Sequence, residues 1–127
     1  MTPDETFPRP LTAREAETLR FMLSPDDPRL ARLREQSKVA VVTGKCACGC
    51  ATIDLRVDRG KASPVSGLCH AAINAQTPEF DPALGPKELI VFLDEGWLSG
   101  LEVVYYADVP PHEFPAIEDF DPPWLAC

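Results

Sequence analysis

Two late apolar segments constrain the fold of this 127-residue chain more than any other feature. Residues 88–94 (ELIVFLD) and 101–107 (LEVVYYA) are rich in β-branched and aromatic side chains, which favour strands. Between them lies Glu95-Gly96-Trp97, and a glycine at such a position is typical of a tight turn. We therefore predict an antiparallel hairpin from these two segments.

Two helices are predicted before the first strand. Thr12-Ala13-Arg14-Glu15 has the pattern of a capping box, in which the Thr12 hydroxyl accepts from the Glu15 amide and the Glu15 carboxylate reaches back. Asp27 and Pro28 suit the N-cap and the first position of a second helix. Helical spacing then predicts these buried faces: Ala16, Leu19, Met22 and Leu23, followed by Leu30, Leu33 and Ser37.

Three further segments favour strands. Residues 38–44 are apolar on both faces, and residues 51–57 alternate between apolar and polar side chains. Residues 71–76 alternate more weakly, which indicates a short edge strand.

These elements predict an α+β fold class: two N-terminal helices packed on a mainly antiparallel sheet of four to five strands, with a Pro-rich C-terminal tail. The expected organisation is an irregular lead-in over residues 1–10 and a single α+β domain over residues 11–107. A Pro-rich acidic tail is expected over residues 108–127, because this composition favours extended backbone without a core of its own. Its apolar side chains could still dock the tail on the domain: Phe114, Ile117, Phe120 and Trp124.

The net charge of −8 is concentrated in the second half of the chain, where residues 62–127 carry eleven acidic residues and one basic residue. Such a surface repels phosphate backbones and anionic membranes, and it favours encounter with a basic partner. We therefore expect no nucleic acid and no membrane among its partners, but an unknown protein partner of basic character. The chain has neither an apolar run of membrane-spanning length nor a start that resembles a signal peptide, which predicts a soluble, cytoplasmic protein.

A short segment from Cys46 to Cys50 contains three of the five cysteines. In a cytoplasmic protein, an odd number of cysteines indicates free thiols or metal ligands. Cys69 and His70 would add enough soft ligands for a tetrahedral zinc site. The candidate metal ligands are therefore Cys46, Cys48, Cys50, Cys69 and His70.

The cysteine spacing leaves three interpretations open. C-x-C steps on an extended strand hold the Cα atoms about 6.6 Å apart, and zinc knuckles normally leave more residues between ligands, although a bend at Gly49 would bring the sulfurs closer. Cys48 and Cys50 could instead close a strained redox disulfide, or the cysteines could be buried apolar residues. A regular strand would turn all three sulfurs outward, whereas a bulge at Gly49 would turn Cys50 inward.

Signatures of catalysis are weak in this sequence. His70 and His112 are its two histidines, and it contains no G-x-S-x-G, P-loop or H-E-x-x-H motif. Cys69 and His70 are adjacent, and neighbours in a strand point to opposite faces, which is poor geometry for a nucleophile and its base. We therefore predict no catalytic residues, no cofactor-binding residues and no enzymatic activity.

Two stretches carry a resemblance to other proteins. The C-x-C-G-C-x-T-I-D segment that begins at Cys46 and the L-E-V-V-x-Y hairpin sequence that begins at Leu101 resemble those of a group of uncharacterised small bacterial proteins. The likeness covers roughly residues 11–115, and it implies an α+β domain without implying an activity. Cys69 and Cys127 fall outside the shared pattern.

The resulting functional prediction is a non-enzymatic protein-interaction module, immunity or antitoxin-like in character, that binds a basic protein through its acidic half. The alternative is a zinc-binding domain that uses the cluster of Cys46, Cys48 and Cys50. Zinc is the one cofactor considered, and it belongs to this alternative alone.

Overall fold

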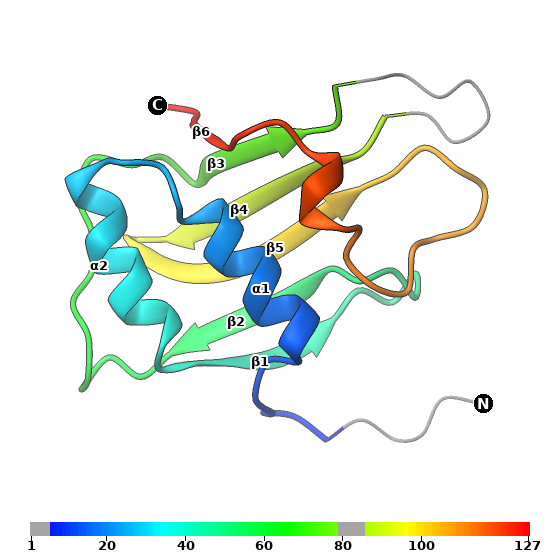
Figure 1. Ribbon diagram of the computed structural model, residues 1–127. Coiled ribbons are helices and arrows are strands. Elements are labelled where there is room, and N and C mark those ends of the chain that lie inside the picture. The colour runs from blue at the N-terminus through cyan, green and yellow to red at the C-terminus, as the bar shows by residue number, and fades with distance from the viewer. Residues whose placement is uncertain (1–5, 79–85) are drawn as a thin grey trace.

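The computed structural model describes residues 6–78 and 86–127 (Figure 1). In this part of the chain, two α-helices accompany six antiparallel strands in the sheet order β1-β2-β5-β4-β3-β6. The elements are α1 (Ala13–Met22), α2 (Pro28–Ser37), β1 (Ala40–Lys45), β2 (Ile53–Val57), β3 (Ala71–Gln76), β4 (Glu88–Asp94), β5 (Trp97–Val104), a 3₁₀ turn (Ile117–Asp119) and β6 (Trp124–Leu125). The α+β class is confirmed.

The predicted strand count of four to five was too low. The C-terminal segment supplies a sixth strand, β6, which pairs with β3 through Ile73 with Leu125 and Asn74 with Trp124. The prediction that residues 71–76 form an edge strand was therefore also wrong, because β3 lies between β4 and β6. A two-residue strand in a Pro-rich segment has no alternating pattern long enough to be recognised.

Both helices begin where the capping residues predict. Thr12 caps α1 in a complete capping box with Glu15, and Asp27 caps α2 by accepting from the Arg29 amide. The expected burial of Ser37 was wrong: Gln36 is fully buried instead. Its amide makes three hydrogen bonds to main-chain groups of neighbouring segments, which removes the cost of burying it.

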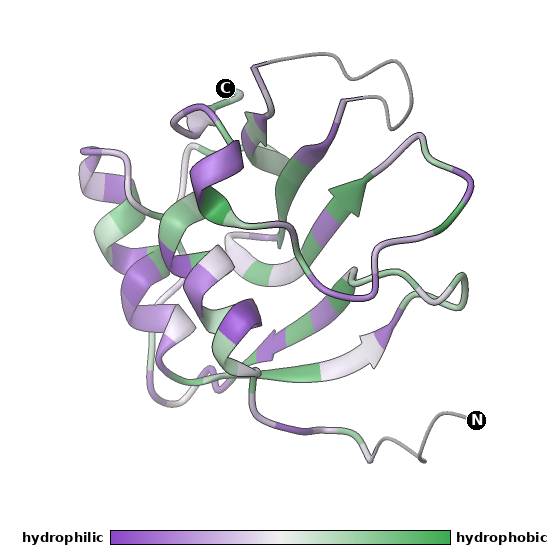
Figure 2. Cartoon of the chain, turned by 45° about the vertical axis from the view of Figure 1, so that its right-hand side comes forward, coloured by the Kyte–Doolittle hydropathy of each residue, from purple (hydrophilic) through white to green (hydrophobic). Residues whose placement is uncertain are grey.

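One face of the sheet is covered by the helices together with the C-terminal segment. Contacts join α1 to β3 and β4, and α2 to β5. Phe114 and Phe120 are buried in the same core, and the Phe120 ring lies 6.5 Å from the ring of Phe21. Figure 2 shows the strands banded by alternating hydrophobic and hydrophilic residues, as expected of a sheet with one buried face. The covering layer is therefore not built from the two helices alone.

The predicted late hairpin is present, but its second strand begins earlier than expected. β4 ends at Asp94 and β5 begins at Trp97, which leaves a two-residue turn of Glu95 (φ 50°) and Gly96 (φ 84°). Such left-handed turns match the twist of the flanking strands. A Cβ atom at Gly96 would overlap the Val65 carbonyl oxygen, so this position requires glycine.

The cysteine-rich segment is a loop at the tip of the β1–β2 hairpin rather than the start of a strand. β1 ends at Lys45 and β2 begins at Ile53. Neither the regular strand nor the bulge considered for Gly49 is observed; this residue turns the loop with φ 88°. The register shift of this hairpin lies earlier, between Val42 and Gly44.

Candidate thiol site in the β1–β2 loop

The β1–β2 loop brings three sulfur atoms together. The ligand atoms of Cys46, Cys48 and Cys50 all lie within 4.8 Å of one another, and the Sγ atoms of Cys46 and Cys48 are 2.9 Å apart. Cys46 and Cys48 are exposed, whereas Cys50 is 2% exposed. The group therefore has one sulfur buried in the core and two that solvent reaches.

Backbone hydrogen bonds hold the loop in this shape. The Cys46 N–H donates to the Thr52 carbonyl oxygen (3.1 Å), and the Gly49 N–H donates to the Cys46 carbonyl oxygen (3.2 Å). The Thr52 hydroxyl accepts from the Val103 N–H at 3.0 Å, which ties the base of the loop to β5. Because the left-handed conformation of Gly49 reverses the chain, thiols two residues apart converge instead of lying on a straight strand.

The three thiols do not ionise alike. The pKa of Cys48 falls from the usual 9.0 to about 6, chiefly because Cys46 and then Cys50 donate hydrogen bonds to its sulfur. The Cys50 N–H, at 3.4 Å, and the Tyr105 side chain also favour the thiolate. The hydrogen bond between Cys46 and Cys48 raises the pKa of Cys46. At neutral pH, Cys48 is thus a thiolate beside the protonated Cys46.

Tyr105 is the functional candidate that sequence reasoning missed. It follows β5, the strand that pairs with β2, and its hydrogen bond to Cys48 raises the pKa of its own phenol. The sequence places Tyr105 at the end of the predicted late hairpin. It does not show that β5 pairs with β2, because strand pairing between distant segments has no local pattern, and this pairing is what brings Tyr105 to the cysteine loop.

The sulfur geometry suits a thiophilic metal ion. A zinc–sulfur bond of about 2.3 Å places two sulfurs of a tetrahedral site about 3.8 Å apart. The observed sulfur separations lie between 2.9 Å and at most 4.8 Å, so small side-chain rotations would reach that value. Among residues 6–78 and 86–127, no imidazole or carboxylate joins this group. In this part of the chain, the three cysteine sulfurs are therefore the grouped candidate donors, and the exposed side of Cys46 and Cys48 leaves room for a further ligand.

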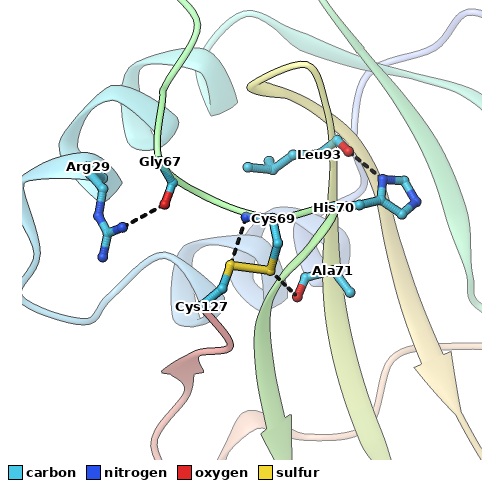
Figure 3. The surroundings of a disulfide bond; sticks show 7 residues. All are labelled: Arg29, Gly67, Cys69, His70, Ala71, Leu93 and Cys127. Carbon is cyan, nitrogen blue, oxygen red and sulfur yellow. Dashed lines mark hydrogen bonds between the residues drawn. A yellow bond between two sulfur atoms is a disulfide. The ribbon is translucent and has the colours of Figure 1, made fainter.

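Two residues predicted as metal ligands lie elsewhere. Cys69 forms a disulfide with Cys127, with 6.1 Å between the Cα atoms (Figure 3). His70 points its Nδ1 atom at the Leu93 carbonyl oxygen, and its ring centroid lies 5.0 Å from that of Phe92, with the two rings tilted by 48°. Cys69 and His70 directly precede β3, and Figure 1 shows the start of β3 at the opposite end of the sheet from the β1–β2 loop.

Cys69 and His70 are therefore corrected as candidate ligands of the cluster, and the expectation of free thiols is corrected for Cys69 and Cys127. The disulfide was missed because its two residues are separated by 58 positions, so only the tertiary fold brings them together. The expectation of free thiols stands for Cys46, Cys48 and Cys50.

No family model, curated protein or solved structure matches the chain. In the part of the chain that the structure describes, no helix has the length and apolar character needed to cross a membrane.

Proposed function

We propose that the protein binds a thiophilic metal ion, with zinc as the first candidate, through the sulfurs of Cys46, Cys48 and Cys50. The observation that carries this proposal is the convergence of these three sulfurs within 4.8 Å in one loop. Thiolates are the ligands that zinc and other soft ions prefer. The role is one of binding rather than catalysis.

The ionisation of the cluster supports the same proposal. A metal binds cysteine as the thiolate, so the protons of the thiols must leave first. The lowered pKa of Cys48 means that one ligand is already ionised at neutral pH. The apolar core does not include the exposed Cys46 and Cys48, so the ion would occupy a preformed site rather than drive folding.

Elemental analysis of the untagged protein, followed by zinc titration against a chromophoric chelator, tests this proposal. We expect one ion per chain, lost on substitution of Cys46→Ser or Cys48→Ser. Ala47→Ser is the matched control, because it introduces a serine at an exposed position of the same loop and leaves the three thiols in place. Absence of stoichiometric binding by the reduced protein, or equal binding by all three variants, would refute the proposal.

A second candidate function is the binding of a basic protein partner. It is supported by the exposed aromatic and aliphatic side chains of the acidic C-terminal segment, where Tyr106 is 62%, Val109 71% and Trp124 44% exposed. Apolar contacts surrounded by charge are the usual composition of a protein interface. Capture of a partner at low salt that weakens as salt rises supports this candidate, and binding that does not respond to salt contradicts the electrostatic part of it.

A further inference from the structure

Two of the three sulfurs are closer to each other than ligands of one metal would be. The Sγ atoms of Cys46 and Cys48 are 2.9 Å apart. Two thiolates on one zinc ion would be about 3.8 Å apart, whereas a disulfide bond is about 2.05 Å long. The pair therefore lies between the two arrangements, and a closing motion of about 0.9 Å would permit a covalent bond.

We propose that Cys48 is an oxidation site for hydroperoxides and that Cys46 is the thiol that resolves it, giving a Cys46–Cys48 disulfide. Cys48 is exposed and accepts hydrogen bonds from the Cys46 thiol and from the Cys50 N–H. Cys48 is thus the hydrogen-bond acceptor of the pair, and Cys46 is the donor. The Cys50 sulfur is not itself the oxidation site, because a side chain that is 2% exposed does not meet a hydroperoxide from solvent.

The reaction balances with one hydroperoxide as oxidant. The Cys48 sulfur attacks the terminal oxygen, an S–O bond forms, the O–O bond breaks, and the departing alkoxide takes a proton to become the alcohol. The resulting sulfenic acid is then attacked by the Cys46 sulfur. The S–S bond forms, the S–O bond breaks, and hydroxide leaves with the Cys46 proton as water. Two thiols lose two hydrogens, and the peroxide bond receives the two electrons.

This oxidation would also regulate the metal site. That regulation, unlike the oxidation itself, rests on the proposed function. A disulfide removes two of the three thiolate ligands, so the oxidised loop holds no ion, and a bound ion shields both sulfurs from the oxidant. Metal binding and disulfide formation are thus mutually exclusive states of one loop.

Trypsin offers a direct measurement, because cleavage after Lys45 and Arg56 releases residues 46–56 with the three thiols and neither Cys69 nor Cys127. The metal-free protein, with its Cys69–Cys127 disulfide intact, is treated with stoichiometric hydrogen peroxide and digested under non-reducing conditions. We expect this peptide to lose two hydrogens and to regain them on treatment with a dithiol reductant.

Variants assign the two sulfurs. Cys50→Ala should retain the two-hydrogen loss, Cys48→Ser should abolish it, and Cys46→Ser should slow it at least tenfold and leave a sulfenic acid that dimedone traps. The proposal would be overturned if the two-hydrogen loss required Cys50 but not Cys46. It would also be overturned if the peptide were oxidised only to sulfinic or sulfonic acid.

A parallel experiment on the metal-loaded protein separates this inference from the proposed function. We expect zinc to slow oxidation of the peptide at least tenfold and peroxide to release one ion for each disulfide formed. If no ion binds but the disulfide forms, the metal function fails and the oxidation site stands. If the ion binds and the peptide never loses two hydrogens, the oxidation site fails and the metal function stands.

Discussion

Cys48 should react with iodoacetamide along a pH profile whose midpoint lies near 6, the value of its pKa. At pH 7 that value corresponds to a thiolate fraction of about 90%, against about 1% for a thiol with the usual pKa of 9.0. Because the group becomes reactive by losing a proton, reactivity is lost as the pH falls through 6 and is nearly complete at pH 8.

The cause of the shift is tested by one pair of substitutions. The hydrogen bond from Cys46 is the largest contribution to the lowered pKa of Cys48, so Cys46→Ala should raise the midpoint by at least about one pH unit. Cys46→Ser keeps a donor at the same position and should raise it less. The assay follows alkylation of residues 46–56 by tryptic mass spectrometry, with fragmentation locating the modified sulfur.

Two outcomes would refute this reasoning. A midpoint between 8 and 9 in the unsubstituted protein would mean that Cys48 behaves as an ordinary exposed thiol. An unchanged midpoint in Cys46→Ala would mean that the neighbouring thiol does not cause the shift.

Three further predictions concern the scaffold, and each is measured by urea or thermal unfolding. Gln36→Leu should lower the free energy of unfolding by about 2–4 kcal/mol, because the buried Leu98 N–H loses its acceptor and the Ser63 and Gly96 carbonyl oxygens lose a donor; a loss below about 1 kcal/mol contradicts it. Gly96→Ala should cost more than roughly 1 kcal/mol, since its φ is 84°, and a neutral effect would contradict the overlap with Val65. Reduction of the Cys69–Cys127 disulfide, which spans 58 positions, should cost about 4 kcal/mol in the chain-entropy description, and an unchanged melting temperature under a dithiol contradicts this.

The parts of the fold that depend on residues close together in the chain could be predicted from the sequence. The caps at Thr12 and Asp27 act within one helical turn, and the alternation along residues 53–57 reflects one buried and one exposed face. Phe114 and Phe120 could be named from the sequence as side chains able to dock the tail, but local pattern does not show that these two are buried while Trp124 is exposed. They sit in a Pro-rich acidic segment whose composition favours extended chain, and their apolar contacts are with residues distant in sequence.

The candidate site was predictable in its members but not in its geometry. Cys46, Cys48 and Cys50 stand out by residue type and spacing, and the structure brings them together. Their convergence depends on a loop conformation at Gly49, which C-x-C spacing does not specify. The assignment of Cys69 failed for a different reason: its partner is the final residue of the chain, and long-range pairing has no local signature.

The position of the cluster allows its chemistry to change without unfolding the domain. The Cys46 N–H and the Thr52 hydroxyl tie both sides of the loop to its base and to β5, and none of these hydrogen bonds uses a thiol. Cys50 anchors one sulfur in the core while Cys46 and Cys48 remain in solvent. A metal ion or a disulfide at the exposed pair would therefore alter a few side-chain torsions and leave the β1–β2 register intact. Loss of stability on oxidation comparable to reduction of the Cys69–Cys127 disulfide would contradict this separation of site and scaffold.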